Sequence, residues 1–204
     1  MNPTPRILVL YAHPAHHHSH VNRRMFDALR GLPNVTTRDL YECYPDFHVD
    51  VALEQSLLAE SDLVVLQHPL QWYSMPALMK EYLDVVLEHG WAYGHEGHAL
   101  RGKDLLLAVT TGGPQASYTS QGYHRRPFSD FLPPYEQTAF LCGMRWHPPV
   151  VFHGARLADE AAISRHVQVY VDKLSRYPRW TEEPEQPVPA DIAAGEYIHD
   201  PEEP

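Results

Sequence analysis

The chain has 204 residues, of which 44% are hydrophobic and 21% charged, and its formal net charge at pH 7 is −10. This length suffices for one domain with a true core, and the negative charge argues against nucleic acid as a partner, because nucleic acid requires a basic surface. No apolar run approaches the roughly 20 residues of a membrane span, and no signal peptide is recognisable, so we expect a soluble cytoplasmic protein.

Five short apolar runs alternate with helical patterns along the chain. Strands are expected at 7–12, 35–40, 63–66, 105–109 and 149–153. Helices are expected from Ser19 as N-cap, over 51–60, from Pro76 to Gly90, from Pro127 to Met144, and from about Asp159. Residues 41–50 are expected to be irregular.

This alternation is typical of a parallel sheet covered by helices on both faces. Neither G-x-x-x-x-G-K-[ST] nor G-x-G-x-x-G occurs, which argues against a P-loop or a dinucleotide-binding Rossmann domain. We therefore predict an α/β flavodoxin-like fold, a doubly wound five-stranded parallel sheet with the order 2-1-3-4-5. Its site is expected at the switch between the first and third strands.

The C-terminal stretch differs from the rest in composition. After Arg179 there is no Lys or Arg, whereas acidic residues and prolines are frequent. We predict a folded domain over 1–180 and an extended or disordered acidic tail over 181–204. Two roles remain open for the tail: a solubilising appendage, or a segment that docks on a second subunit through Ile192, Tyr197 and Ile198.

Three loops are predicted to meet at one edge of the sheet: His13–Asn22, His68–Pro76 and Thr110–His124. The first combines a helix N-terminus with Ser19, His20 and Asn22, a combination that favours a phosphate. The second sets Trp72 beside Tyr73, and the third offers hydroxyls and close backbone approach to a planar ring. Alone, each has an ordinary structural explanation, namely a capped helix, core packing or a tight turn; together they favour flavin mononucleotide.

Histidines are dense in the first loop, and two cysteines occur in the chain. His13, His16, His17, His18 and His20 have side chains that suit zinc, copper or nickel, but no carboxylate or thiolate accompanies them in sequence, so no metal site is predicted. Cys43 and Cys142 are far apart and form no CxxC motif, which suits a reducing compartment, and Cys142 is expected to be a buried core thiol.

Four motifs carry a resemblance to a known family: AHPxxxxSHxN after the first strand, HPLQWYSMPALMKEYLDVVL after the third, GWAYG, and TTGGxxxSYxxQGYH after the fourth. Over Arg6 to Arg176 the chain resembles the NAD(P)H:quinone oxidoreductase family. Within that family it is most similar to the ancillary quinone-reductase subunits of bacterial glutathione-regulated potassium-efflux systems.

The resemblance assigns roles to these residues. It implies that the cofactor's phosphate is bound by His13, Ser19, His20, Val21 and Asn22. It places the flavin ring beside Pro69, Leu70, Gln71, Trp72 and Tyr73, and the ring's polar edge on Thr110, Thr111, Gly112 and Gly113. Tyr118 and His124 correspond to the catalytic pair over the ring, with a lid-holding pair as the structural alternative.

The implied reaction is two-electron reduction of quinones by NAD(P)H, by ping-pong hydride transfer through FMN, with FAD as the alternative cofactor. The implied partners are a second copy of the chain and a potassium-efflux antiporter, which would place the protein at the cytoplasmic face of the inner membrane. Trp91, Tyr93, Tyr123 and Phe128 are expected to be exposed at the dimer interface. Two other functions remain open: a regulatory flavoprotein subunit with little turnover, and a one-electron carrier like flavodoxin.

Overall fold

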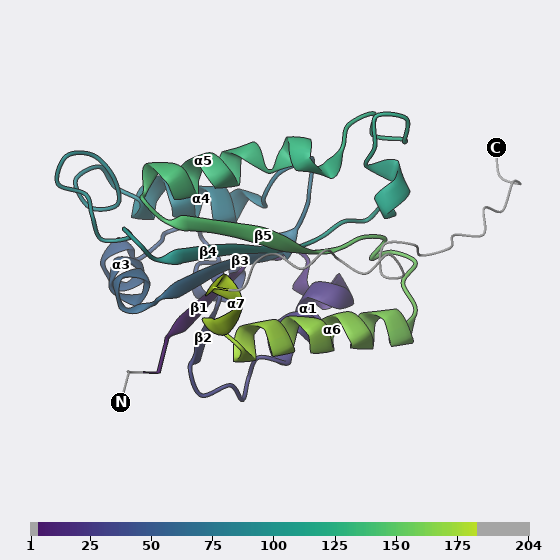
Figure 1. Ribbon diagram of the computed structural model, residues 1–204, viewed down its shortest axis with the longest axis horizontal. Helices are drawn as coiled ribbons and strands as arrows, with labels where there is room; N and C mark the ends of the chain where they lie inside the picture. The colour runs from purple at the N-terminus through teal and green to yellow at the C-terminus, as the bar shows by residue number, and fades with distance from the viewer. Residues whose placement is uncertain (1–3, 183–204) are drawn as a thin grey trace, which may run out of the picture.

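Five parallel strands form one sheet in the order β2-β1-β3-β4-β5, as Figure 1 shows. This computed structural model describes residues 4–182. The strands are β1 (Ile7–Tyr11), β2 (Val35–Asp39), β3 (Leu63–Pro69), β4 (Asp104–Thr110) and β5 (Arg145–Phe152). The predicted fold class, strand order and parallel arrangement are confirmed.

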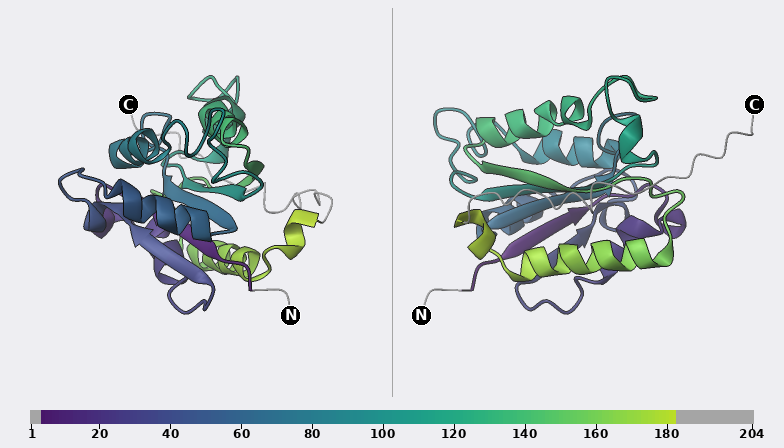
Figure 2. Two further views of the ribbon diagram at one scale, coloured as in Figure 1. Left: turned by 90° about the vertical axis from the view of Figure 1, so that its left-hand side faces the viewer. Right: turned by 45° about the vertical axis from the view of Figure 1, so that its right-hand side comes forward.

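Helices cover both faces of the sheet, so that the molecule has three layers (Figure 2). In Figure 1, α4 and α5 lie above the sheet, whereas α1 and α6 lie below it. The helices are α1 (Val21–Asp27), α2 (Leu40–Cys43), α3 (Val51–Glu60), α4 (Ala77–Val86), α5 (Pro133–Leu141), α6 (Glu160–Ser175) and α7 (Arg179–Glu182). Three short 3₁₀ helices are η1 (His16–His18), η2 (Gln115–Ser117) and η3 (Phe128–Phe131).

The core consists of two apolar layers, one on each face of the sheet. Every residue of β1 and β4 is buried, because each strand has a paired neighbour on both sides and helices above and below. This is why their sequences show continuous apolar runs rather than alternation. One layer contains Leu8, Leu10, Leu66, Tyr82 and Leu107. The other contains Ile7, Val9, Met25, Leu106 and Tyr170.

Three strands are longer than predicted; β4 gains one residue at each end, and β3 and β5 gain more. β3 continues past Leu66 to Pro69, and its polar residues Gln67 and His68 are fully buried. β5 begins at Arg145 rather than at Pro149. Its two prolines are tolerated because β5 is an edge strand, where a missing N–H donor can face outward. The pairing register with β4 shifts at this point, between Leu106 and Ala108.

The helix boundaries also differ from the predictions. α1 begins at Val21, and Ser19 accepts a hydrogen bond from the Arg23 N–H (3.1 Å) although it is not the N-cap residue. α4 ends at Val86, before Gly90. α5 begins at Pro133, since proline suits the first helical position, and residues 128–131 form a separate 3₁₀ turn. The stretch expected to be irregular contains α2.

Two fully buried carboxylates tie distant segments together. Asp104 accepts hydrogen bonds from Arg145, His147 and Tyr177 at the edge of the sheet where β4 begins. Glu54 on α3 binds Arg38, Tyr44 and Tyr82. Because each carboxylate has several donors, its burial is compensated.

The acidic tail predicted over 181–204 lies outside the described residues, apart from Thr181 and Glu182, which belong to α7. The proposed anchors Ile192, Tyr197 and Ile198 lie in that part. None of the helices within residues 4–182 has the length and hydrophobicity that a membrane span requires.

Candidate functional site

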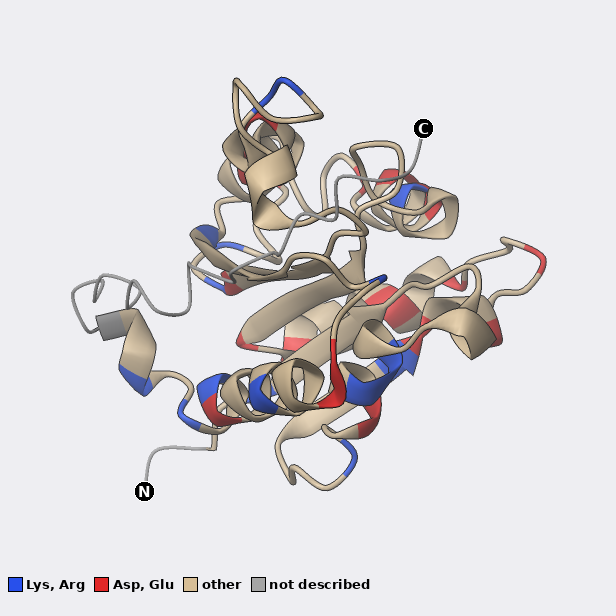
Figure 3. Cartoon of the chain, turned by 90° about the vertical axis from the view of Figure 1, so that its right-hand side faces the viewer, with Lys and Arg blue, Asp and Glu red and all other residues tan. Residues whose placement is uncertain are grey.

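The loops after β1, β3 and β4 meet at the carboxyl edge of the sheet, as predicted for a doubly wound fold. Figure 3 looks onto this edge and shows charged residues scattered among mostly uncharged loops. Here the loops enclose a cavity of about 230 Å³, which we call the edge cavity. It is lined by His13, His18, Ser19, His20, Val21, Asn22, Pro69, Leu70, Gln71, Thr110, Gly112, Ala155 and Arg156.

Asn22 connects the first loop to the strands beneath it. Its side-chain nitrogen donates to the Thr110 hydroxyl (2.6 Å), and its backbone carbonyl accepts from Gln67 Nε2 (2.8 Å). Gln67 in turn accepts a hydrogen bond from the Tyr170 hydroxyl (3.2 Å). The Asn22 side-chain oxygen is buried and has no hydrogen-bond partner within residues 4–182. Asn22 is itself part of the lining of the edge cavity, and buried polar atoms are nearly always paired in proteins.

The loop after β3 is a tight two-residue hairpin. Gln71 and Ser74 exchange backbone hydrogen bonds of 3.0 Å in both directions, with Trp72 and Tyr73 at the turn. Both turn residues have positive φ angles, 48° and 67°, which place them in the left-handed region that glycine and asparagine prefer. The turn leaves the Trp72 side chain 93% exposed. Such strain is typical of functional loops.

This geometry predicts how two substitutions of Trp72 will differ in stability. Trp72→Gly and Trp72→Ala both remove the indole, but only glycine relieves the left-handed strain, which costs about 1–2 kcal/mol for other residues. We therefore expect the glycine variant to be more stable than the alanine variant by about 1 kcal/mol, measured by urea denaturation. Equal midpoints for the two variants would show that this turn is not strained in solution.

The loop after β4 brings Tyr118 and His124 together. Their rings lie 4.3 Å apart, and the Tyr73 hydroxyl is 3.4 Å from His124 Nδ1. A Cβ atom on Gly122 would lie 2.3 Å from the Ala116 carbonyl oxygen, so only glycine allows the loop to fold back in this way. Burial raises the pKa of Tyr118, opposed in part by a hydrogen bond to Thr111, so the phenol stays protonated at neutral pH.

Two residues that follow β5 belong to the same region and were not identified from the sequence. His153 Nδ1 lies 2.9 Å from the Thr111 hydroxyl, which itself donates to the Gly113 carbonyl (2.8 Å). Burial lowers the pKa of His153 to about 4, so the ring is neutral at pH 7 and donates through Nδ1–H. Arg156 lines the edge cavity beside Gly112. The sequence feature that could have identified them is their position at the carboxyl end of the fifth strand.

His68 was expected in the loop after the third strand, but it ends up inside the protein as part of β3. Its ring is fully buried and stacks on Tyr135 at 5.7 Å. Burial lowers its pKa to about 4, so it is neutral at pH 7. Its Nε2 atom and the Tyr135 hydroxyl are both buried without a hydrogen-bond partner in the described part of the chain.

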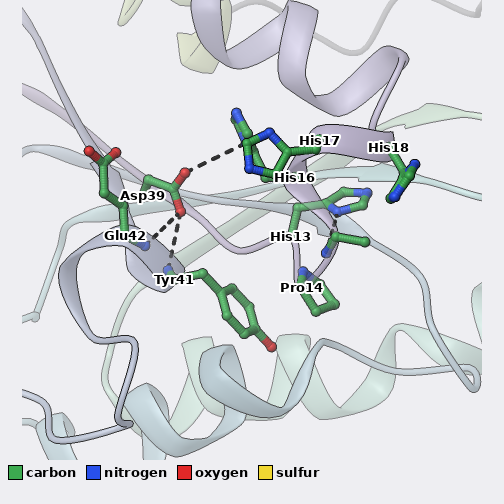
Figure 4. A pocket seen from close by; sticks show the side chains of 9 residues that line it. His13, Pro14, His16, His17, His18, Asp39, Tyr41 and Glu42 are labelled. Carbon is green, nitrogen blue, oxygen red and sulfur yellow. Dashed lines mark hydrogen bonds and ion pairs between the residues drawn. The ribbon is translucent and has the colours of Figure 1, made fainter.

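The sequence suggested that no carboxylate accompanies the histidines of the first loop, but the structure places one beside them. Asp39, at the end of β2, lies 3.6 Å from His16 Nδ1 (Figure 4). Nevertheless, residues 4–182 contain no group of three or more His, Cys, Asp and Glu side chains placed to hold a metal ion. Cys142 is buried, as expected for a core thiol, and both cysteines are free.

A family profile described as "Flavodoxin-like fold" matches residues 5–174. The glutathione-regulated potassium-efflux system ancillary protein KefF of Enterobacter sp. (strain 638) is 47% identical over 168 residues, covering 82% of this chain and 94% of that protein. Among solved structures, general stress protein 14 of Treponema denticola, in complex with FMN, is 38% identical with a TM-score of 0.78, covering 83% of this chain and 98% of the other.

Two further solved structures carry names of different enzymes. An NADPH-quinone reductase from P. pentosaceus is 30% identical with a TM-score of 0.75, covering 82% and 96% of the two chains. A protein described as a thermophilic tryptophan halogenase from Streptomycin violaceusniger is 42% identical with a TM-score of 0.79, covering 82% and 97%. Since relatives of one fold bear such different names, the reaction has to be argued from the site.

Proposed function

Because the chain belongs to the flavodoxin-like family, among the relatives of the potassium-efflux ancillary proteins, we propose that it is a flavoprotein that reduces quinones with NAD(P)H. The observation that carries this proposal is the edge cavity, with the unpaired Asn22 oxygen in its lining. A flavin has hydrogen-bonding groups of both kinds that this lining requires, because its phosphate accepts hydrogen bonds and its ribityl hydroxyls donate them. FMN is proposed ahead of FAD, in line with the FMN complex of the Treponema relative.

The residues present fit this cofactor. Ser19 and His20 provide donors for its phosphate, and Asn22 accepts from a ribityl hydroxyl. At the ring end, a Cβ atom on Gly112 would lie only 3.1 Å from Arg156 Nε, so glycine keeps the backbone there uncrowded, and Gly113 lies beside His124. Pro69, Leu70, Gln71, Trp72 and Tyr73 would flank the ring, and Thr110 and Thr111 its polar edge.

When bound, the flavin supplies two-electron transfer from NAD(P)H to a quinone. The residues of the chain position the substrates and donate the proton. Tyr118 holds a proton at neutral pH and can donate it to a quinone oxygen that gains negative charge. His124 lies against Tyr118 and within reach of the Tyr73 hydroxyl, so it can orient both phenols. Because one open face serves both substrates, they would bind in turn, which gives ping-pong kinetics.

A second role rests on the 47% identical relative, whose name describes an ancillary protein of a potassium-efflux system. By analogy, we propose that the chain also associates with a potassium-efflux antiporter at the cytoplasmic face of the inner membrane. If this role dominates, the protein is chiefly a regulatory flavoprotein with little turnover. The NADPH-quinone reductase among the solved relatives favours turnover.

We also propose a homodimer, although on different surface residues from those expected. Trp91, Tyr93 and Phe128 are half-buried against the core, and only Tyr123 is largely exposed, at 87%. Other large apolar side chains are exposed instead: Trp72 beside the site, and Phe140 and Leu141 at the end of α5. Exposed groups of this kind are typical of interaction surfaces.

Cofactor release tests the flavin assignment. Heat-denatured protein is expected to release FMN. Asn22→Ala should weaken FMN binding about 5- to 100-fold, because loss of a buried hydrogen-bonding group costs about 1–3 kcal/mol. Affinity is measured by quenching of flavin fluorescence on addition to apoprotein. Asn34→Ala is the matched control, since Asn34 bonds the Pro5 carbonyl at the opposite edge. Release of FAD would replace FMN by the alternative cofactor. Release of no flavin would refute the flavin assignment, and equal affinities for the two variants would refute the role of Asn22.

A further inference from the structure

The loop that follows β5 lies along the loop that follows β4, and three backbone hydrogen bonds join the two. The Thr111 N–H donates to the Phe152 carbonyl (2.9 Å), the Ala155 N–H donates to the Thr111 carbonyl (2.9 Å), and the Gly154 N–H donates to the Gly113 carbonyl (2.8 Å). All three bonds involve only backbone atoms. The position of this part of the β4 loop therefore does not depend on the side chains of the β5 loop.

The side chain of His153 adds a link of a different kind. Its Nδ1 atom lies 2.9 Å from the Thr111 hydroxyl, and that hydroxyl donates its one hydrogen to the Gly113 carbonyl (2.8 Å). A hydroxyl whose hydrogen is in use can only accept, so the hydrogen between the two side chains belongs to Nδ1. Because burial lowers the pKa of His153 to about 4, the ring carries this one hydrogen at neutral pH. His153 thereby fixes the direction of the Thr111 hydroxyl.

Two contacts connect His153 to Tyr118, the proton donor of the proposed reaction. The Thr111 hydroxyl that His153 holds also forms a hydrogen bond with Tyr118. In addition, the rings of His153 and Tyr118 lie 5.5 Å apart, and the Phe128 ring packs edge-on against His153 at 5.2 Å. The orientation of the phenol is thus coupled to His153 both by packing and through Thr111.

We propose that His153 is a positioning residue: by donating from Nδ1 to the Thr111 hydroxyl, it holds the Tyr118 phenol in the orientation from which it donates its proton. His153 transfers no proton itself. The inference rests on the proposed function, because it needs Tyr118 as the proton donor. Since backbone bonds alone hold the β4 loop, removal of the imidazole should lower kcat and leave flavin affinity almost unchanged.

Two substitutions of His153 test this division. His153→Leu removes the donor, and we expect kcat for quinone reduction to fall about 10- to 100-fold, because a displacement of about 1 Å at a reacting group can cost about 10²-fold in rate. His153→Asn keeps an N–H close to the position of Nδ1, so its kcat should return to within about threefold of the parent. FMN affinity should stay within about threefold in both variants. The proposal is wrong if His153→Asn is as slow as His153→Leu.

His166→Leu is the matched control. His166 on α6 is also a half-buried imidazole, and burial lowers its pKa to about 4. Its ring contacts Phe152 at 4.8 Å, in the apolar layer opposite the one against which Phe128 packs. It therefore lies on the other face of the sheet from the His153 ring. Its substitution should leave kcat unchanged, and a loss equal to that of His153→Leu would contradict a specific role for His153.

The tautomer of His153 can be measured without any turnover. In ¹⁵N NMR spectra of the labelled, purified protein, the His153 ring signals are those that disappear in His153→Asn. We expect the Nδ1–H tautomer in the parent. Thr111→Val removes the acceptor, so we expect the Nε2–H form to become populated in that variant. An Nε2–H tautomer in the parent would overturn the proposal.

A double substitution tests whether His153 acts through Thr111. With FMN at saturation, the variant that combines His153→Leu with Thr111→Val should be no slower than the slower single variant, because both changes break the same link. Losses that multiply would show independent roles and contradict the proposal. A parent protein that shows the Nδ1–H tautomer but reduces no quinone would refute the proposed function and leave the orienting bond from His153 to Thr111 supported.

Discussion

Tyr118→Phe is expected to lower kcat for quinone reduction by about 10²- to 10⁴-fold, the usual contribution of a positioned proton donor. His124→Gln removes the ring that orients Tyr118 and should also lower kcat. The phenol of Tyr118 is 8% exposed and its pKa is raised chiefly by burial, so it stays protonated until a substrate needs the proton. His124 lies 4.3 Å from it, ring to ring. Phenylalanine and glutamine preserve most of the local volume, so the loop should keep its shape.

The measurement that separates chemistry from structure is kcat together with flavin content. A catalytic pair predicts low kcat with full flavin occupancy and an unchanged unfolding midpoint. Tyr123→Phe is the matched control: Tyr123 precedes His124 and its side chain is 87% exposed, so its hydroxyl should contribute little. Unchanged kcat in Tyr118→Phe and His124→Gln would reduce the pair to holding the loop in place.

Asp104→Ala is expected to destabilise the protein by about 3 kcal/mol, because a buried donor left without its acceptor costs about 1–3 kcal/mol, and two of the donors here, Tyr177 and His147, are largely buried. This is a large share of the ~5–15 kcal/mol that holds a typical domain folded. Arg145 binds the carboxylate through two nitrogens at 2.7 and 2.8 Å, and His147 and Tyr177 donate at 2.7 and 2.8 Å. Without the carboxylate, Tyr177 and His147 lose their acceptor inside the protein, whereas Arg145, whose side chain is 62% exposed, can bind water instead.

The same carboxylate predicts a pH dependence. Burial alone would raise the pKa of Asp104, but the hydrogen bonds from His147, Arg145 and Tyr177 together hold it well below its usual range. A folded-state pKa below the unfolded value of about 3.9 contributes stability that is complete above that pH and is lost as the pH falls further. Urea denaturation should therefore show Asp104→Asn losing less stability than the parent between about pH 4 and pH 2.

Asp84→Ala is the control for both Asp104 experiments. Asp84 forms an exposed ion pair with Lys80 one helical turn away, and exposed pairs of this kind contribute about 0.3–0.5 kcal/mol. Its substitution should shift the unfolding free energy by no more than that. An Asp104→Ala variant as stable as Asp84→Ala would show that the buried cluster contributes nothing to stability.

The parts of the fold that were predictable from sequence are those where local pattern and tertiary environment agree. β1 and β4 lie between paired neighbours, so burial on both faces requires the continuous apolar runs by which they were recognised. The start of β5 was missed because two prolines argue against a strand, and only its edge position makes them acceptable. Gln67 was excluded from β3 because it is polar, but Tyr170, 103 residues later, satisfies it.

For the candidate site, the sequence identified which loops converge but not the contacts between them. The Trp72–Tyr73 turn was missed because tight hairpins are recognised by glycine and asparagine, and neither occurs there. His153 and Arg156 follow β5 without any motif. The pairing of His16 with Asp39 depends on the register of two parallel strands, which the local sequence does not encode.

We propose that this chain passes electrons from a nicotinamide nucleotide to a quinone through a bound flavin. Anaerobic stopped-flow mixing of the purified flavoprotein with NADH, followed by mixing with a soluble quinone, tests it most directly. We expect NADH to bleach the flavin absorbance, and quinone to restore it at a rate no slower than steady-state turnover. Absorbance that NADH leaves unchanged, or that stays bleached after quinone is added, would contradict it.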